Sequence, residues 1–209
     1  GVWVATVETI DFPVSRSVAE FKRNYLAVVN NLKAIGANAI LFQIRPNNDA
    51  FYPSRLNPWS RSLTGREGVG LNGFDPLAFM IQEAHRRGLA FHAWLNPYRV
   101  AGATPLWKKT YLNTLAPGNF ARKHPEYVLS IRRKDGKNQL ILDPGNPAVI
   151  RFLCNTVHEI VTKYDVDGIH LDDYFYPYDG TGSADRATFL RYNRNKMSLE
   201  DWRRENVNT

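Results

Sequence analysis

Short apolar runs alternate with helix-like patterns along this chain, and that alternation limits the fold more than any other feature. The strand-like runs are residues 2–7, 39–44, 91–95 and 169–171. Between them, apolar residues recur at intervals of three and four, which is the spacing of a helix with one buried face. These helical patterns cover 18–35, the stretch from Pro76 and the stretch from Pro147. Repeated strand-then-helix units predict an α/β fold with parallel strands.

Capping signals support the helices. Asp75-Pro76 and Asn146-Pro147 each place a capping side chain before a proline at the first helical position. Gly36 is a plausible end for the first helix, and Ser198 with Asp201 resembles a capping box that opens a last helix.

The connections between these elements are unequal in length. The turns from helix to strand are short, whereas two connections from strand to helix are long, at 46–74 and 97–145. Elaborate segments after the carboxyl ends of parallel strands are typical of the active face of a TIM barrel. A doubly wound open sheet is the alternative, but no G-x-G-x-x-G loop follows any strand.

Side-chain alternation within the strands favours the barrel. In each of three strands one face is aliphatic, as expected under helices, and the other becomes polar and aromatic toward the strand end. We expect the second face to converge on one central cavity; its members are Gln43, Arg45, His92, Trp94, Asn96, His170 and Asp172.

The number of units is too small for closure. A (β/α)8 barrel needs eight units and about 250 residues, whereas the chain has 209 residues and four units. We therefore expect residues 1–209 to be a single barrel domain, the N-terminal half to two-thirds of a (β/α)8 TIM barrel that is incomplete at its C-terminus, or else a chain that pairs with another copy.

Composition excludes several classes of protein. With 44% hydrophobic and 22% charged residues, the chain is neither disordered nor membrane-spanning. The net charge of +7 comes from 27 basic and 20 acidic residues, and it suits either a solvated surface or an anionic partner. The single cysteine, Cys154, cannot form an intrachain disulfide, and its place in a helix predicts a buried thiol. The first residues have a strand-like pattern, so no signal peptide is expected among the residues given.

Asp172 and Asp173 are the candidate catalytic residues. They follow the last strand, where a carboxylic acid can protonate a leaving oxygen and an anion can support an oxocarbenium-like centre. Alternation favours Asp172 as the inward group, and Asp173 either assists it or caps a turn.

Residues near the strand ends are the candidate substrate contacts. Arg45 either binds carboxylate or hydroxyl groups or pairs with an acidic neighbour, and Asp49 either binds substrate or stabilises an Asx turn. Trp94 and Tyr98 either stack on sugar rings or pack in the core. The full set of predicted substrate-binding residues is Arg45, Asp49, His92, Trp94, Asn96, Tyr98, Arg99, His170, Tyr174 and Tyr176.

A metal site is a weaker alternative. His92, His170, Asp143 and Asp172 have suitable ligand atoms, but no H-x-H or H-E-x-x-H spacing supports a site. No cofactor or metal is therefore expected. A serine triad also lacks its G-x-S-x-G motif.

Five segments of the sequence resemble the glycosyl-hydrolase-like 10 family of bacterial proteins. They are residues 1–6, 45–59, 88–99, 142–147 (LDPGNP) and 167–177 (DGIHLDDYFYP). The resemblance implies a TIM-barrel glycosidase of the cell envelope, exported or lipid-anchored. It also suggests peptidoglycan glycan strands stripped of peptides as the substrate, and a family sequence that continues past Thr209.

The leading hypothesis is therefore an O-glycosyl hydrolase acting on a cell-wall polysaccharide, with Asp172 as catalytic carboxylate. A non-catalytic glycan-binding barrel and a metal-dependent hydrolase remain as alternatives. The expected partner is a polysaccharide or oligosaccharide, with no nucleic acid and no membrane span, and the oligomeric state is left open.

Overall fold

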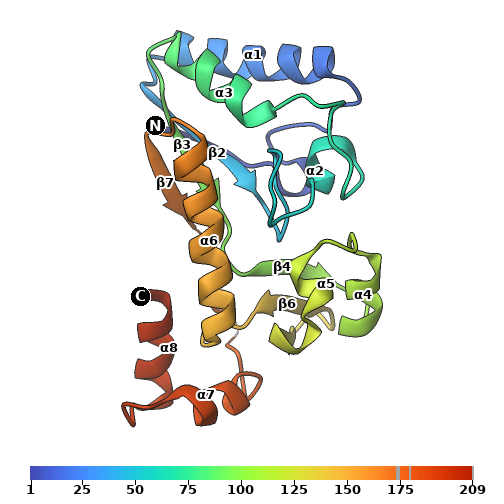
Figure 1. Ribbon diagram of the computed structural model, residues 1–209, viewed down its shortest axis with the longest axis vertical. Coiled ribbons are helices and arrows are strands. Elements are labelled where there is room, and N and C mark those ends of the chain that lie inside the picture. Colours follow the sequence, from blue (N-terminus) through green and yellow to red (C-terminus); the bar gives the residue numbers. More distant parts are fainter. Residues whose placement is uncertain (173–174, 179, 209) are drawn as a thin grey trace.

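A parallel sheet of four strands forms the centre of the molecule. The computed structural model describes residues 1–172, 175–178 and 180–208. In it, β1 (Val2–Val4), β2 (Ala39–Arg45), β3 (Ala90–Leu95) and β7 (Gly168–Leu171) pair in parallel in the order β1-β2-β3-β7 (Figure 1). The predicted parallel α/β arrangement is confirmed.

Three long helices accompany this sheet. They are α1 (Val18–Ala34), α3 (Pro76–His85) and α6 (Pro147–Lys163). Helix α1 buries Phe21, Tyr25, Val29 and Leu32, which recur at four, four and three residues along one face. Figure 1 shows α1 and α3 side by side at one end, with α6 running along the molecule.

The predicted capping residues act as expected. Asp75 Oδ1 accepts a hydrogen bond from the Ala78 N–H at 3.1 Å, and Asn146 Oδ1 accepts one from the Ala148 N–H at 2.9 Å. Ser198 Oγ accepts from the Asp201 N–H at 3.1 Å at the start of α8 (Leu199–Asn208). Each cap satisfies a donor that the helix itself cannot, which typically contributes about 1 kcal/mol.

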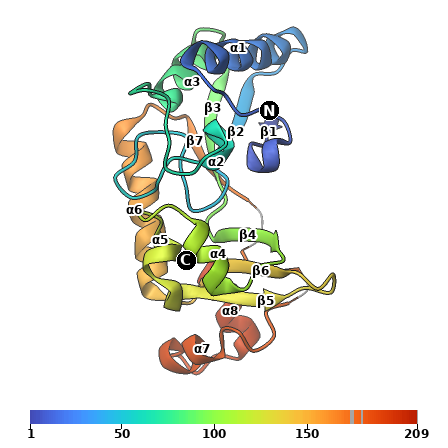
Figure 2. The same cartoon turned by 90° about the vertical axis from the view of Figure 1, so that its right-hand side faces the viewer.

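A second sheet occupies the long connection between β3 and α6. It is antiparallel, with β4 (Arg99–Thr104), β5 (Val128–Arg132) and β6 (Asn138–Leu142) in the order β4-β6-β5. Figure 2 shows these strands packed with α4 (Lys108–Thr114) and α5 (Phe120–Lys123), beyond the carboxyl ends of the parallel strands. The sequence patterns did not predict these strands.

The remaining elements are short. They are η1 (Val7–Thr9), α2 (Arg61–Thr64), η2 (Pro125–Tyr127) and α7 (Arg186–Tyr192).

Two apolar clusters hold the fold together. One lies between the parallel sheet and α1 and α3, and includes Phe42, Phe91 and Met80. The other lies under the antiparallel sheet and includes Leu140, Ile141 and Phe152 of α6. The strand ends lie between these two clusters.

The parallel sheet is curled. Its two edge strands are β1 and β7, yet the rings of Trp3 on β1 and His170 on β7 have centroids only 5.7 Å apart. Side chains from opposite edges can meet only if the sheet bends round, because neighbouring strands lie about 4.8 Å apart. In the described residues the four-stranded sheet stays open, so this chain does not form a closed barrel.

Two local predictions are wrong. The first strand ends at Val4 instead of residue 7, since the backbone turns into η1, where Glu8 and Thr9 have φ of 50° and 57°. Cys154 is exposed, because it lies outside the row of α6 residues that faces the core.

Within the described residues, no helix combines the length and the apolar character needed to cross a membrane.

Candidate functional site

A chain of hydrogen bonds joins the carboxyl ends of all four parallel strands. Gln43 Oε1 accepts from the backbone N–H groups of Thr6, at 2.9 Å, and Val7, at 2.8 Å. Gln43 Nε2 donates to Asn96 Oδ1, and Asn96 Nδ2 donates to the carbonyl of Asp172 at 2.8 Å. Gln43 and Asn96 are completely buried. This chain, which we call the strand-end relay, fixes the backbone at Asp172 relative to the other three strands.

Asp172 lies at the exposed end of the strand-end relay. Its N–H is 3.4 Å from the Leu95 carbonyl, which continues the pairing of β3 with β7, and its side chain is exposed. The carboxylate therefore stands at the rim of the sheet. Asp173 and Tyr174, the predicted partner and a predicted substrate contact, lie outside the described residues.

Aromatic side chains cover the inner face of the curled sheet. Trp94 and His170 meet edge to face with centroids 6.2 Å apart, and the Trp3 ring lies 5.7 Å from that of His170. His92 lies against Gly168, its partner in the register of β3 and β7. The predicted grouping of Trp94, His92 and His170 on one face is therefore present.

Two buried nitrogen atoms on this face have no hydrogen-bond partner among the described residues. They are Trp94 Nε1 and His170 Nε2. An unpaired buried polar atom typically costs about 1–3 kcal/mol, so a ligand hydroxyl at this position would be stabilising.

Arg45 does not share the inner face, and this prediction is wrong. A β-bulge shifts the register, so that Gln43 pairs with Trp94 but Arg45 pairs with Leu95. The extra residue turns Arg45 to the helix side of the sheet, where its guanidinium lies 5.6 Å from the Phe152 ring.

The Arg45 guanidinium is fully buried and its donors are used inside the protein. It donates to the carbonyls of Asn96 and Pro97 and to the side chains of Asn48 and Asn57, at 2.8–3.2 Å. Burial lowers its pKa to about 10, which still leaves it charged at neutral pH. Arg45 therefore orders the loops after β2 and β3, and the structure gives no support to a substrate contact.

Two other predicted substrate contacts are also interior groups. Asp49 accepts from Ser60 Oγ at 2.7 Å and from the Asn47 N–H at 3.0 Å, the turn-stabilising alternative, and burial raises its pKa to about 6. The Tyr98 ring packs edge to face on Phe175 in the second core, and burial raises its pKa to about 12. Hydrogen bonds within a turn account for Asp49, and packing accounts for Tyr98, without a ligand.

Tyr176 is half-buried against the last helix. Its hydroxyl accepts from Asn206 Nδ2 at 3.3 Å, and the Arg203 guanidinium lies 5.9 Å from its ring. It is therefore part of the packing of α8 on the body of the protein.

A cavity of about 690 Å³ opens beside the ends of β1 and β2. Its walls come from η1, α2, β4 and the β5–β6 hairpin, and of the predicted site residues only Arg99 contributes to it. Its other charged or aromatic lining residues are Glu8, Arg61, Tyr111 and Arg133. The lining has three arginines and one glutamate, and two of the arginines, Arg61 and Arg133, form ion pairs with Glu67 and Asp135 outside it.

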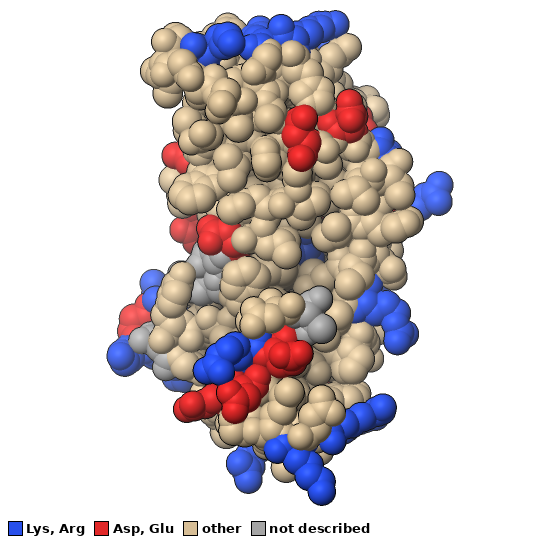
Figure 3. Space-filling view, turned by 90° about the vertical axis from the view of Figure 1, so that its left-hand side faces the viewer, with Lys and Arg blue, Asp and Glu red and all other residues tan. Residues whose placement is uncertain are grey.

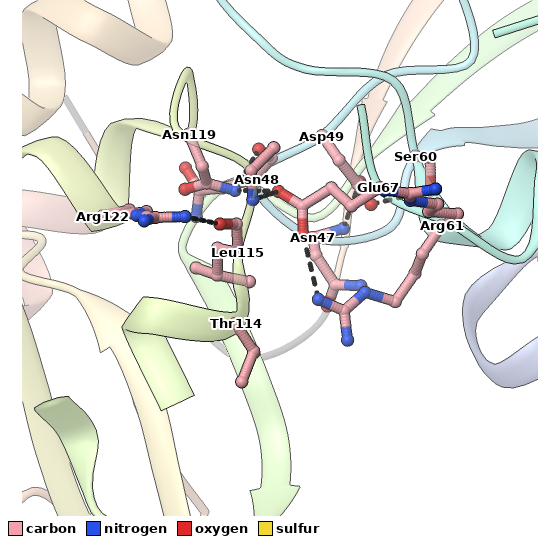
Figure 4. Close-up of polar contacts among 12 residues, drawn as sticks. Asn47, Asn48, Asp49, Ser60, Arg61, Glu67, Thr114, Leu115, Asn119 and Arg122 are labelled. Carbon is pink, nitrogen blue, oxygen red and sulfur yellow. Dashed lines mark hydrogen bonds and ion pairs between the residues drawn. The ribbon is translucent and has the colours of Figure 1, made fainter. Parts of the chain in front are cut away.

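A polar network holds the wall of this cavity in place. Glu67 accepts from Arg61 at 2.9 Å, from Asn119 Nδ2 at 2.9 Å and from the Ala116 N–H at 3.2 Å. Asn119 Nδ2 also donates to the Asn48 carbonyl at 3.0 Å. Figure 4 shows these side chains converging from the loops after β2 and after α4.

Charge on the surface is dispersed. Figure 3 shows a row of Lys and Arg at the α1 end, separate acidic groups below it, and mixed basic and acidic groups toward the α7–α8 end. The net charge does not form one basic stripe on this face.

The metal alternative gains no support from the described residues. Nowhere in them do three or more His, Cys, Asp or Glu side chains gather closely enough to hold a metal ion. Asp143, one of the residues considered, instead accepts hydrogen bonds from Thr188 Oγ1 and from the Gly145 N–H.

Comparison with known proteins gives matches along the whole chain. The family model described as "Glycosyl hydrolase-like 10" matches residues 1–209. Glycosyl hydrolase YngK of Bacillus subtilis (strain 168) is 44% identical over 212 residues, and Glycosyl hydrolase DigH of Escherichia coli (strain K12) is 37% identical over 221 residues. Each alignment covers 99% of this chain, but only 39% and 49% of the respective relatives. The chain thus spans less than half the length of these two relatives.

Solved structures include one with a similar fold over most of both chains. It is a hypothetical protein from Ruminiclostridium thermocellum ATCC 27405, with a TM-score of 0.50 and 16% identity, covering 85% of this chain and 88% of that one.

Proposed function

The chain belongs to the glycosyl hydrolase-like 10 family, and on this basis we propose that the protein hydrolyses O-glycosidic bonds of a bacterial cell-wall polysaccharide. The observation that carries the proposal is the strand-end relay, which ends at the backbone carbonyl of Asp172, a residue whose side chain is exposed. Buried amides that fix the backbone of one carboxylate are the kind of support a catalytic acid requires.

The curled sheet is the N-terminal part of a (β/α)8 barrel in this proposal. Parallel pairing, the contact between Trp3 and His170 across the sheet, and the cavity beside the strand ends all support it. In such a barrel, catalytic groups gather at the carboxyl ends of the strands, where Asp172 lies.

Asp172 acts as the acid in the proposed reaction. It gives its proton to the leaving glycosidic oxygen while the bond to the anomeric carbon breaks, and water adds its hydroxyl to that carbon and returns a proton. Asp173 is the proposed partner. If the sugar carries an N-acetyl group, the acidic pair orients the acetamide as an internal nucleophile, which is a known exception to two-carboxylate catalysis.

Peptide-free peptidoglycan strands are the proposed substrate, and the cell envelope is the proposed location. Each muramic acid of such a strand carries a carboxylate, and the cavity beside the strand ends is lined by Arg61, Arg99 and Arg133. Opposite charge supports this pairing of substrate and cavity.

Replacement of Asp172 tests the assignment. In the full-length protein we expect Asp172→Asn to lower the rate of glycan hydrolysis by about 10²–10⁴-fold, the usual contribution of a general acid. The measurement is release of soluble fragments from peptide-free glycan strands. Asp165→Asn, at another exposed aspartate, is the matched control and should keep full activity.

Full hydrolysis by Asp172→Asn would contradict the catalytic assignment. If the unaltered protein binds insoluble glycan but releases no fragments, the glycan-binding alternative replaces the enzyme. If strong chelators abolish hydrolysis, the metal-dependent hydrolase replaces the proposed mechanism.

A further inference from the structure

A second pocket lies away from the strand ends, where α5 meets the first half of α6. It has a volume of about 310 Å³ and shares no lining residue with the cavity beside the strand ends. The loop after β2 closes its third side. Its lining residues are Arg55, Leu56, Gly118, Phe120, Lys123, His124, Ala148, Arg151, Phe152 and Asn155.

Three cationic side chains surround this pocket, and no acidic residue lines it. They are Arg55, Lys123 and Arg151, one from each of the three segments. In residues 1–172, 175–178 and 180–208, none of the three side chains forms an ion pair or a hydrogen bond with the protein. Like charges held near one another repel, so an anion bound among them would be stabilised.

Two carboxylates contact lining residues without lining the pocket themselves. Glu159 accepts from Ser54 Oγ and from the Arg55 N–H at 2.7 Å, and Glu126 lies 3.2 Å from His124 Nδ1. Neither carboxylate lines the pocket.

Helix α6 lines the pocket with one side of its first half. Ala148, Arg151, Phe152 and Asn155 follow one another at intervals of three, one and three residues, which places them on a single face of the helix. This face gives the pocket both a cation and part of its apolar wall.

One wall of the pocket is apolar. Phe120 and Phe152 stack in parallel with centroids 3.9 Å apart, and Leu56 lies beside them. An inorganic anion gains nothing from contact with an apolar wall, whereas the C–H face of a sugar ring can pack against it. The volume, at the lower end of the usual 300–1,000 Å³ for ligand pockets, has room for a single sugar ring.

We propose that this pocket binds a saccharide unit that carries a phosphate or carboxylate group, with Arg55, Lys123 and Arg151 contacting the anion. The choice of a saccharide rests on the proposed function, whereas the need for an anion rests on the pocket alone. In this arrangement the protein has a glycan contact outside its catalytic region.

Calorimetric titration of the full-length protein at low salt tests the inference. The probes are glucose 6-phosphate, glucuronate, glucose and inorganic phosphate. We expect the two anionic sugars to bind at least about tenfold more tightly than glucose or phosphate, the difference that one charged contact makes. Comparing glucose 6-phosphate with glucuronate tells which anion is preferred.

Substitutions locate the binding. Arg151→Ala and Lys123→Ala should each weaken glucose 6-phosphate binding by about tenfold, and because both side chains are exposed, both variants should fold. Arg23→Ala, at an exposed arginine on α1, is the matched control and should bind as the unaltered protein does. Unchanged binding in both pocket variants, or equal binding of glucose and glucose 6-phosphate, would overturn the inference.

This test is separate from that of the proposed function. A protein that hydrolyses glycan but fails these titrations loses only the second site. A protein that binds anionic sugars here but hydrolyses nothing loses only the proposed activity. Binding of phosphate as tight as that of glucose 6-phosphate would overturn the saccharide and leave an anion site.

Discussion

Polar residues near the strand ends are buried and have partners within the protein. Gln43, Arg45 and Asn96 have no exposed surface, and Asp49 is 2% exposed. Each lies among several hydrogen-bonding groups, so replacement by an apolar residue would leave more than one polar atom unpaired. At this scale the candidate site is a rigid frame on which one carboxylate, that of Asp172, is exposed.

Asp49 should make stability depend on pH in an unusual direction. Burial, opposed by hydrogen bonds from Ser60 and Asn47, raises its pKa from 3.8 to about 6. Between these values the folded state binds more protons than the unfolded state, so Asp49 lowers stability as pH rises through this window. Asp49→Asn removes the cost of the buried charge. The variant should therefore gain stability relative to the unaltered protein as pH rises, by about 1–3 kcal/mol between about pH 4 and about pH 7.

Urea unfolding of both proteins at several pH values measures this difference. Asp11→Asn, which replaces an exposed aspartate, serves as the control. An advantage of Asp49→Asn that is constant or falls across the window would show that the Asp49 carboxylate is not destabilised by burial.

Adjacent strands of the parallel sheet approach closely where β7 begins. A Cβ atom built on Gly168 would lie 2.5 Å from Nδ1 of His92, its partner on β3. The glycine therefore gives the His92 ring room on the inner face of the sheet. Glycine is required here because a side chain would not fit, and not for its backbone freedom, since the backbone at Gly168 has no positive φ.

Gly168→Ala should destabilise the protein by about 1–3 kcal/mol through overpacking. In a His92→Ala background the ring is gone, and the same substitution should cost markedly less. Thermal unfolding of the two single variants and the double variant gives the coupling between the two positions.

Gly102→Ala is the control, because a Cβ atom there meets nothing within 4 Å. Equal costs of Gly168→Ala with and without the His92 ring would refute the proposed steric contact.

The molecule as a whole consists of two apolar clusters joined by polar loops. Asn119 donates to both Asn48 and Glu67, and its Oδ1 accepts from the Ala121 N–H, so its side chain ties the segment before α5 to the loops after β2. Glu67 is almost buried, with 6% of its side chain exposed. It accepts hydrogen bonds from Asn119 and from the Ala116 N–H and so holds the same two segments together (Figure 4).

Glu67→Ala should lower the free energy of unfolding by about 2–4 kcal/mol, because the Asn119 side chain and the Ala116 N–H both lose their hydrogen bonds to Glu67. Glu67→Gln keeps an acceptor for both and loses mainly the ion pair with Arg61, which is 39% exposed, so it should cost less than about 1 kcal/mol. Chemical denaturation gives both values, and hydrogen exchange at Ala116 should speed up only in Glu67→Ala.

Equal effects of the two variants would mean that the ion pair, and not the hydrogen bonds to the 116–119 segment, joins the two halves. Glu126→Ala, at an exposed glutamate, controls for loss of charge.

Local sequence determined the elements whose signals are short-range. Capping side chains at Asp75, Asn146 and Ser198 and the apolar spacing of α1 and α6 act within one or two turns, so they could be identified from the chain alone. Alternation within β3 and β7 likewise placed Trp94 and His170 on one face, since the period of a strand is fixed by its geometry.

Only the tertiary structure decided features that depend on distant pairing. The antiparallel sheet β4-β6-β5 forms because its short strands pair with one another and cover a second core, which no single strand signals. The bulge that turns Arg45 toward α6 exists only in relation to β3, and the strand-end relay needs β1, β2, β3 and β7 in one register. Side-chain periodicity is a property of a segment, whereas register and curl are properties of the segments once they are packed together.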